Sequence, residues 1–246
     1  MNRAYWLRDG ALTEGALEDF FPFLSDEGRH VIALVGAGGK TTLMYELARE
    51  CCRRGYRTAV TTTTRILRPA HCPSCRTLEE CQKRWANREY AVWGMERSDG
   101  KLGALAAGDF DSLAAEADVL LVEADGARRM ACKVPAAHEP VIPAGADTVI
   151  GVLGMDALGK PLEAVCFRPE ETAAVLNCGV GHRLTPEDLA RILRSDAGTR
   201  KGVGGRAYYA VLNKCDDPAR RSQGEQILRR LGERAALTCF APEYRR

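Results

Sequence analysis

Short apolar runs, each about as long as one β-strand, alternate along the chain with segments of helical periodicity. The strand-like runs lie at 31–35, 57–61, 90–93, 118–122, 147–154, 207–213 and 236–240. The helical segments are expected at 41–54, 78–87, 169–195 and 217–232. Several runs are apolar at successive positions, which is typical of parallel strands covered on both faces. The pattern therefore predicts an α/β fold of three layers, in which a mostly parallel sheet has helices on both faces.

Two parts of the chain show no such alternation. Residues 1–30 are expected to be a lead-in, with a short helix or turn at 16–24. Residues 67–116 are the least regular part, and turns are expected at 99–101 and 107–109, where glycine and aspartate cluster.

A glycine-rich turn joins the first expected strand to the first expected helix. Its residues are Gly36, Ala37, Gly38, Gly39, Lys40, Thr41 and Thr42. Glycines let backbone N–H groups turn toward phosphate oxygens, and the N-terminus of the following helix attracts the same anion. Lys40 can reach the terminal phosphates, and the Thr41 hydroxyl can ligate Mg²⁺. The turn therefore predicts a nucleotide-binding phosphate loop in a P-loop NTPase-like fold.

This loop is two residues shorter than the common form, because only Ala37 and Gly38 lie between Gly36 and Gly39-Lys40. A shortened Gly-x-x-Gly-Lys-Thr loop resembles that of the Mur-type ATP-dependent ligases. The resemblance favours ATP and a ligase- or kinase-like reaction.

The apolar run at 118–122 ends in an acidic turn. Glu123 stands at the expected strand end, and Asp125 and Gly126 follow in the turn. A phosphate-loop protein places the carboxylate that holds Mg²⁺, directly or through water, at this position. We therefore expect Lys40, Glu123 and Asp125 to be catalytic, and Thr41, Glu123 and Asp125 to hold Mg²⁺.

Two further groups of polar residues are candidates for contact with substrate or for a switch. Thr63, Thr64 and Arg65 follow the second strand, and ligands of open parallel sheets bind beyond the carboxyl ends of the strands. His138 and Glu139 lie in the proline-rich segment 133–143, which is expected to be extended.

The expected strand at 207–213 ends in Asn213-Lys214-Cys215-Asp216. In GTPases an Asn-Lys-x-Asp motif recognises guanine, since the aspartate accepts hydrogen bonds from the ring N1–H and the exocyclic amine. Adenine has an acceptor at N1, so it would leave such a carboxylate poorly paired. Asn213, Lys214 and Asp216 therefore favour GTP, whereas the short loop favours ATP.

Length and composition agree with a single domain at 1–246, since the chain has 246 residues, of which 46% are hydrophobic. We divide it into a phosphate-loop unit at 31–66, a less regular insertion at 67–116, and a part at 117–246 with the acidic strand end and base recognition. The net charge of +2 argues against a nucleic-acid partner.

No apolar run reaches membrane-spanning length, and the charged start lacks the apolar core of a signal peptide. We therefore expect a cytoplasmic protein without a membrane partner. Cys72 and Cys75 have the spacing of a zinc knuckle, with Cys81 nearby, but no second pair follows. We expect no structural zinc.

Between about residues 30 and 216 the motifs are Gly-Ala-Gly-Gly-Lys-Thr-Thr, Thr-Thr-Thr-Thr-Arg, Glu-Ala-Asp-Gly-Ala, His-Glu-Pro-Val-Ile-Pro and Asn-Lys-Cys-Asp. This composite resembles the YqeC family, whose members are described as accessory proteins of selenium-dependent molybdenum hydroxylases. The resemblance implies a role in maturing or inserting a selenium-containing molybdenum cofactor. The implied partners are a molybdenum hydroxylase client or its cofactor-maturation proteins. The loop and the acid-ended strand are also similar to metallochaperone GTPases that mature nickel enzymes, an analogy that supports Glu123 as the acid on the Mg²⁺ side.

Three functions stay open on the sequence. The leading hypothesis is a maturation factor that binds Mg²⁺ with GTP and hydrolyses the nucleotide. The second is an ATP-dependent ligase- or kinase-like enzyme. The third is a module that binds a nucleotide or a pterin-nucleotide cofactor without hydrolysis.

Overall fold

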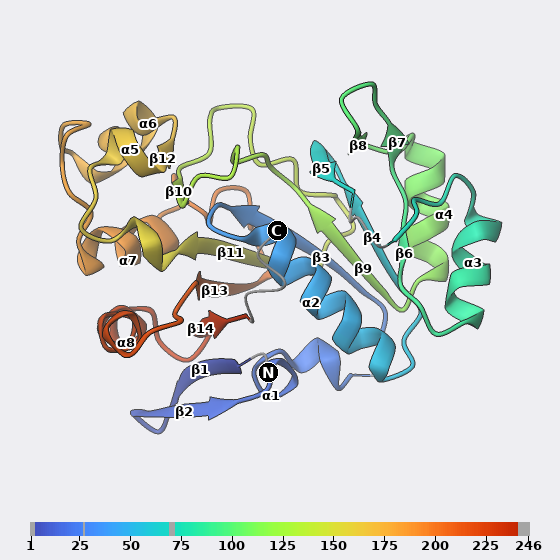
Figure 1. Cartoon of the computed structure of the whole chain (residues 1–246), viewed down its shortest axis with the longest axis horizontal. Coiled ribbons are helices and arrows are strands. Elements are labelled where there is room, and N and C mark those ends of the chain that lie inside the picture. Colours follow the sequence, from blue (N-terminus) through green and yellow to red (C-terminus); the bar gives the residue numbers. More distant parts are fainter. Residues whose placement is uncertain (1–2, 27, 69–71, 241–246) are drawn as a thin grey trace.

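The computed structural model describes residues 3–26, 28–68 and 72–240, which form one large sheet with helices on both faces (Figure 1). The nine strands of this sheet, in spatial order, are β2 (Ala11–Gly15), β1 (Arg3–Arg8), β14 (Ala235–Cys239), β13 (Ala207–Asn213), β11 (Thr148–Gly154), β3 (His30–Gly36), β9 (Val119–Glu123), β4 (Thr58–Thr62) and β6 (Ala91–Val92). The strands from β14 to β6 pair in parallel. Strand β1 pairs antiparallel with both β14 and β2. The predicted α/β class is confirmed.

Two small sheets and the helices complete the fold. The small sheets are β5 (Arg65–Leu67), β8 (Lys101–Gly103) and β7 (Met95–Glu96), and β10 (Cys132–Lys133) with β12 (Cys166–Phe167). The helices are α1 (Leu17–Phe20), α2 (Lys40–Arg53), α3 (Leu78–Ala86), α4 (Ala107–Glu116), α5 (Leu162–Val165), α6 (Pro169–Leu176), α7 (Pro186–Arg194) and α8 (Pro218–Leu231), with 3₁₀ turns η1 (Pro22–Leu24) and η2 (Met155–Ala157). None of the helices in the described ranges is long and apolar enough to cross a membrane.

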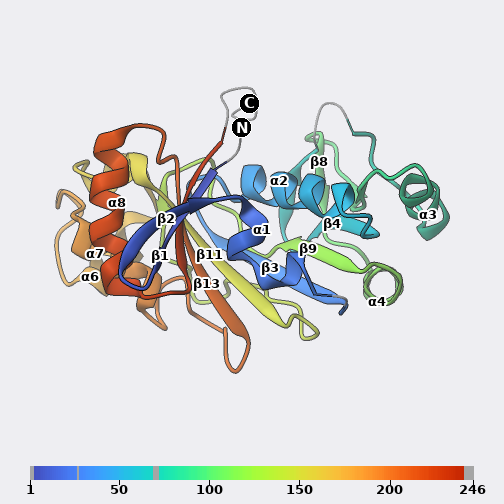
Figure 2. The same ribbon diagram turned by 90° about the horizontal axis from the view of Figure 1, so that it is seen from below.

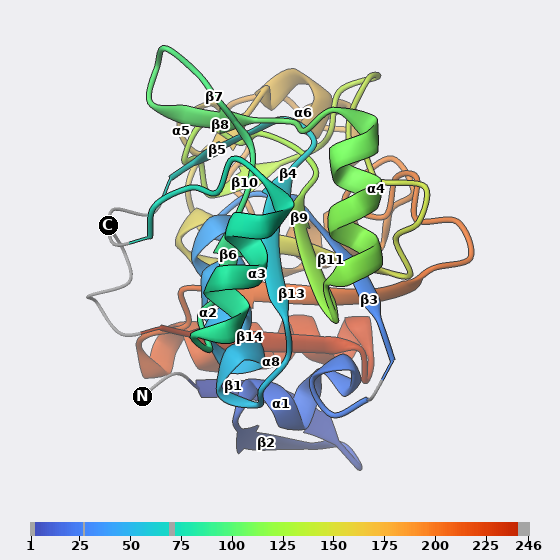
Figure 3. The ribbon, with the colours of Figure 1, turned by 90° about the vertical axis from the view of Figure 1, so that its right-hand side faces the viewer.

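The helices cover the sheet as the continuous apolar strands require. On one face, α1, η1 and α2 pack over side chains such as Ile32, Leu34 and Leu121. On the other face, α7 and α8 pack against the β13–β14 end, whereas α3 and α4 pack against the β4–β6 end (Figures 2 and 3). Because both faces of the central strands are buried, their side chains are apolar at successive positions.

The parallel register brings the candidate motifs to one edge of the sheet. Gly36 of β3 pairs with Val152 of β11, and Leu34 pairs with Glu123 of β9. Strand β11 in turn pairs Gly154 with Asn213 of β13. The glycine-rich loop, the acidic turn and the Asn-Lys-x-Asp motif therefore leave adjacent strands at the same carboxyl edge.

The lead-in expected at residues 1–30 is wrong in its first half, because β1 and β2 form a hairpin on the edge of the main sheet. Asp9 and Gly10 connect the strands, and both have positive φ, at 52° and 79°. This is the backbone of a two-residue type I′ turn, for which Asp-Gly is a preferred sequence. The signal was therefore present in the sequence. The short helix expected at 16–24 is found as α1 and η1.

Two other expectations need correction. The helical segment at 169–195 is two helices, α6 and α7. The helix start that Thr185 and Pro186 indicate in the sequence is confirmed, as the capping box at the start of α7. The turn expected at 107–109 is instead the start of α4, whose N-cap, Ala106, has no side-chain hydrogen bond to mark it. The other expected strands and helices are present, with ends shifted by a few residues.

The edge hairpin leads to a stability prediction. Trp6 of β1 is 8% exposed and packs 5.9 Å from the ring of Phe20. Replacing it with alanine removes a large buried side chain, so Trp6→Ala is expected to lower the free energy of unfolding by about 3–5 kcal/mol. The exposed neighbour Arg8 is the control, and Arg8→Ala is expected to stay within about 0.5 kcal/mol of the parent. Urea denaturation measures both, and equal effects would contradict a packed hairpin.

Candidate functional site

The first half of the glycine-rich loop is fixed by hydrogen bonds to its neighbours. The Gly36 N–H donates to the Asp125 carboxylate at 3.1 Å and 3.2 Å. The N–H groups of Ala37 and Gly38 donate to the carbonyls of Val152 and Met130 at 2.8 Å and 2.9 Å. Gly38 has a φ of +76°, and a Cβ there would lie 2.0 Å from the Gly154 nitrogen. Only glycine allows the backbone at position 38 to lie this close to the backbone of Gly154.

The second half of the loop opens helix α2. Gly39 is its N-cap, with a left-handed φ of 119°. The N–H groups of the first helical turn, from Lys40 to Thr42, have no acceptor within the helix, and they carry the positive end of its dipole. These groups, rather than the anchored N–H groups of Gly36 to Gly38, are suited to bind phosphate oxygens.

Lys40 is buried beside this loop. Its Nζ donates to the Gly36 carbonyl at 2.5 Å and lies 3.1 Å from the Asp125 carboxylate. Burial alone would lower the pKa of the Lys40 ammonium, but the carboxylates of Asp125 and Glu123 raise it above its ordinary value. The ammonium therefore stays charged, and a phosphate would compete with these two partners for it.

Glu123 and Thr41 meet across the gap between β9 and α2. The Thr41 hydroxyl donates to the Glu123 carboxylate at 2.7 Å. Glu123 is 6% exposed, and burial raises the pKa of its carboxyl, although Lys40 and the Thr41 hydroxyl act in the other direction. Mg²⁺ in phosphate sites takes one or two protein oxygens and keeps several waters. This hydroxyl–carboxylate pair fits such an ion, because a divalent charge would stabilise the buried carboxylate.

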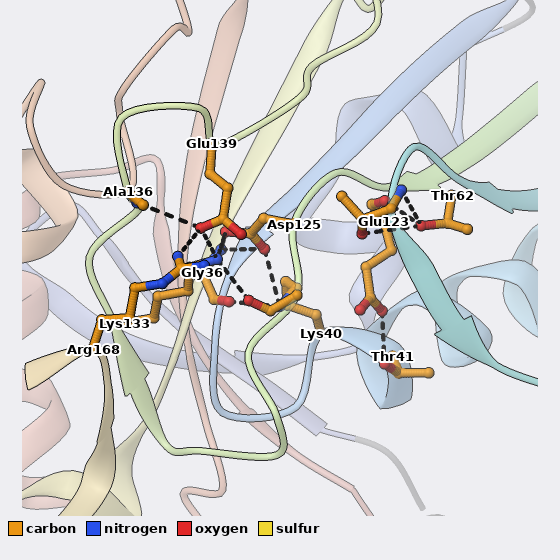
Figure 4. Close-up of polar contacts among 12 residues, drawn as sticks. Gly36, Lys40, Thr41, Thr62, Glu123, Asp125, Lys133, Ala136, Glu139 and Arg168 are labelled. Atoms are coloured by element: carbon orange, nitrogen blue, oxygen red, sulfur yellow. Dashed lines mark hydrogen bonds and ion pairs between the residues drawn. The ribbon is translucent and has the colours of Figure 1, made fainter. Parts of the chain in front are cut away.

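Asp125 connects the loop to a second buried lysine that we did not single out from the sequence. Lys133, at the end of β10, is fully buried and lies 3.1 Å from the Asp125 carboxylate. Its Nζ also donates to the Gly126 carbonyl at 2.6 Å. Asp125 thus lies between Lys40 and Lys133 (Figure 4). The sequence signal was a lone lysine within the apolar stretch 131–137.

Glu139 extends this network and His138 does not. Glu139 lies 2.7 Å from Lys133 and 2.5 Å from Arg168, the second residue that the sequence did not reveal. Burial would raise the pKa of the Glu139 carboxyl, but its hydrogen bonds to Lys133 and Arg168 lower it below the ordinary value. The side chain of His138 is exposed. The five charges run from Lys40 through Asp125, Lys133 and Glu139 to Arg168.

The threonines after β4 are close to the acidic turn, but Arg65 points elsewhere. The Thr63 N–H donates to the Glu123 carbonyl at 3.1 Å, and its hydroxyl donates to the Val141 carbonyl at 2.7 Å. The Thr64 N–H donates to the Thr62 hydroxyl at 3.0 Å. Arg65 is exposed on strand β5. Thr63 therefore fixes the proline-rich segment beside the end of β9.

The Asn-Lys-x-Asp motif lies against the glycine-rich loop. The Asn213 amide donates to the Gly39 carbonyl at 3.4 Å, and its oxygen accepts from the Thr238 hydroxyl at 3.2 Å. A Cβ on Gly39 would meet the Asn213 amide nitrogen at 2.1 Å. Asn213 therefore joins the loop to β14.

The other two residues of the motif have partners of their own. Lys214 has a φ of 64°, and its Nζ pairs with Asp156 at 2.7 Å. The Asp216 carboxylate lies 3.8 Å from Arg220 and accepts from the Cys239 thiol at 3.5 Å. Asp156 was not singled out from the sequence, because its pairing with Lys214 spans 58 positions.

The cysteines of the irregular part are buried. Cys72, Cys75 and Cys81 are each 3% exposed or less. Arg84 donates to the Cys72 sulfur at 3.3 Å. Across the ranges that the structure describes, no three His, Cys, Asp or Glu side chains are grouped so as to hold a metal ion.

Comparisons with known proteins relate this chain to one protein family. The family model described as "YqeC protein" matches residues 32–170. A protein of Escherichia coli (strain K12), described as "Uncharacterized protein YqeC", is 30% identical over 205 residues, which cover 78% of this chain and 80% of that protein. The crystal structure of FlhF complexed with GMPPNP/Mg(2+) matches with a TM-score of 0.42 and 15% identity, and the match covers 85% of this chain and 64% of the FlhF chain. Since the family model spans more than half of the sequence and the relative is similar over most of both chains, this protein belongs to the YqeC family.

Proposed function

We propose that this protein binds Mg²⁺ with a nucleoside triphosphate, preferentially GTP, and hydrolyses it during the maturation of selenium-dependent molybdenum hydroxylases. The observation that carries the nucleotide part is the 2.7 Å contact between Thr41 and Glu123, which joins the first turn of α2 to the acidic end of β9. Lys40 and the N-terminal end of α2, with the positive end of its helix dipole, lie beside it. A loop, a lysine and an acid in this arrangement suit a triphosphate with its metal ion.

Each residue then has a distinct role. The first turn of α2 binds phosphate oxygens, and Lys40 leaves Asp125 to contact the terminal phosphates. Thr41 and Glu123 hold Mg²⁺, which neutralises charge on the phosphates when bound. Asp125 stays fixed by the Gly36 N–H and Lys133, so it can orient the group that attacks the terminal phosphate.

Guanine preference rests on the Asn-Lys-x-Asp motif and on its place in the fold. Asn213 is bonded to the Gly39 carbonyl, so the motif lies beside the phosphate loop. Asp216 is partly exposed, and its carboxylate can accept the two hydrogen bonds that guanine donates. The maturation role rests on the resemblance of the motif order to the YqeC family.

An ATP-dependent ligase- or kinase-like activity is the second candidate. The observation in its favour is the short loop, which has only Ala37 and Gly38 between Gly36 and the Gly39-Lys40 pair. Formation of an acyl phosphate or a phosphorylated product would identify this activity. Nucleotide binding without any phosphate release would instead identify a non-hydrolysing module.

The role of Lys40 can be tested by nucleotide binding. Lys40→Ala removes the ammonium that contacts the phosphates, so affinity for Mg²⁺-GTP is expected to fall by roughly 10- to 100-fold, the range for one charge-assisted hydrogen bond. Isothermal titration calorimetry measures the affinities. Lys83, which is exposed on α3, is the control, and Lys83→Ala should bind like the parent. Equal affinity of the Lys40→Ala variant and the parent would refute the phosphate-loop assignment.

The base preference can be tested at Asp216. Asp216→Asn replaces a carboxylate acceptor by an amide, so binding of GTP is expected to weaken by tenfold or more and binding of xanthosine triphosphate to improve. The control is Asp217→Asn, because Asp217 caps α8 and asparagine caps helices equally well. Competition titrations with GTP, ATP and xanthosine triphosphate measure the relative affinities of each variant for the three nucleotides. Equal affinities of the parent for ATP and GTP would contradict the assignment of guanine recognition to this motif.

The buried Glu123 carboxylate predicts a pH-dependent stability. Burial raises its pKa in the folded state, so the ionised form destabilises the fold as pH rises through that pKa. Glu123→Gln removes the ionisable group, and with it this loss of stability, and keeps an acceptor for the Thr41 hydroxyl. Without nucleotide, the variant is expected to be more stable than the parent at neutral pH, and the difference should vanish below about pH 4, the ordinary glutamate range.

Urea denaturation between pH 4 and pH 8 measures this difference. The exposed Glu163 supplies the control, and Glu163→Gln is expected to change stability by no more than about 0.5 kcal/mol. Saturating Mg²⁺-nucleotide should reverse the order, since the ligand stabilises the parent more strongly than the variant. A variant that is less stable than the parent at neutral pH without nucleotide would contradict the assigned burial cost.

A further inference from the structure

Three cationic side chains surround the ring of Phe167, next to the phosphate loop. The guanidinium carbons of Arg168 and Arg128 lie 4.5 Å and 5.3 Å from the ring centroid, and the Lys133 Nζ lies at 5.6 Å. Phe167 is the last residue of β12 and pairs with Lys133 of β10. We call Arg128, Lys133, Phe167 and Arg168 the Phe167 cluster.

The cations of the Phe167 cluster are unequally neutralised. Lys133 and Arg168 share the Glu139 carboxylate, and Lys133 also reaches Asp125. Arg128 is exposed and has no carboxylate partner among the residues that the structure describes. An arginine that stacks on an aromatic ring keeps its in-plane N–H donors available for a planar or tetrahedral oxyanion. The cluster therefore has donors and positive charge to offer at the surface.

The backbone at the cluster is held in an unfavourable conformation. Arg128 and Arg129 have φ values of 46° and 64°, and Arg168 has a φ of 60°. Left-handed backbone is costly for residues with a Cβ, and it persists where the surrounding structure imposes it, often at binding sites. This second observation is independent of the side-chain charges. Both arginines that stack on Phe167, Arg128 and Arg168, therefore have left-handed backbone.

The Phe167 cluster lies next to the phosphate loop, on the side away from Thr41 and Glu123, the proposed Mg²⁺ ligands. The Gly38 N–H of the loop donates to the carbonyl of Met130, two residues after Arg128. Asp125 lies 3.1 Å from both Lys40 and Lys133. In Figure 4, Lys133 and Arg168 lie to one side of Lys40, whereas Thr41 and Glu123 lie to the other. A group bound at the cluster would therefore lie near the terminal phosphate that Lys40 contacts.

We propose that Arg128 and Arg168, stacked on Phe167, bind the oxyanion of a second substrate, a phosphate or carboxylate group, beside the terminal phosphate of the nucleotide. Only the placement of this oxyanion beside the terminal phosphate rests on the proposed function. The anion site itself is built from residues outside the phosphate loop. Phosphate and carboxylate share the geometry that a guanidinium recognises through two parallel hydrogen bonds.

Calorimetry on the full chain tests the proposal. The protein is first saturated with Mg²⁺ and a non-hydrolysable GTP analogue, which fills the phosphate loop, and is then titrated with inorganic phosphate or, separately, with succinate. The parent is expected to bind at least one probe. Arg128→Gln is expected to weaken that binding by roughly tenfold or more, through loss of a charge-assisted contact. The adjacent, exposed Arg129 lacks the ring contact, so Arg129→Gln should bind the probe like the parent.

Three results would overturn the proposal. They are no binding of either probe to the loaded parent, equal weakening by Arg129→Gln, and a loss of affinity for the GTP analogue in Arg128→Gln, which would assign Arg128 to the nucleotide. The probe that binds with higher affinity shows whether the site prefers a phosphate or a carboxylate group.

If the analogue itself does not bind, the proposed function fails separately. The same titrations are then made on nucleotide-free Lys40→Ala protein with and without Arg128→Gln. Weaker probe binding in the double variant supports the site, and equal binding overturns it.

Discussion

One buried carboxylate, Asp125, determines the arrangement of the site. It is 1% exposed and accepts from the Gly36 N–H while it pairs with Lys40 and Lys133. A buried charge without partners is strongly unfavourable, and removing one member of a buried pair leaves the other uncompensated. The position of Asp125 therefore fixes the start of the glycine-rich loop, the lysine that follows it, and the end of β10. Glu139 extends this dependence to the proline-rich segment and to Arg168.

The parallel sheet makes this convergence possible. Residues that are far apart in the sequence leave adjacent strands at one edge, and short contacts then join them. Asn213 connects the loop to β14 through Gly39 and Thr238, and Thr41 connects α2 to β9 through Glu123. Each contact is made by a residue at or just beyond a strand end. The register of the strands therefore sets which polar groups meet.

The sequence predicted the features that depend on local pattern and missed those that depend on pairing. The apolar runs predicted the α/β fold, and the helix after the glycine-rich turn is present as α2. Asp156 and Arg168 became visible only in the structure, because their partners lie in other segments and no local periodicity marks them. Lys133 has a sequence signal as a lone lysine within the apolar stretch 131–137, but its ion pairs with Asp125 and Glu139 do not follow from that pattern. The edge hairpin is a different case, since its Asp9-Gly10 turn is a hairpin signal that the local sequence carries. The split of 169–195 into two helices followed from Thr185 and Pro186, a helix start inside an apparently continuous pattern.

The competition for Lys40 has a consequence for the whole network. Its ammonium is held by the Gly36 carbonyl and by Asp125, so a phosphate that binds Lys40 as proposed competes with these partners. Asp125 then keeps the Gly36 N–H and Lys133, which are enough to hold a carboxylate in a buried place. Lys133 then remains as a cationic partner of Asp125, and it also pairs with Glu139. A nucleotide that binds as proposed would therefore be connected, through Asp125, Lys133 and Glu139, to the charges around Phe167.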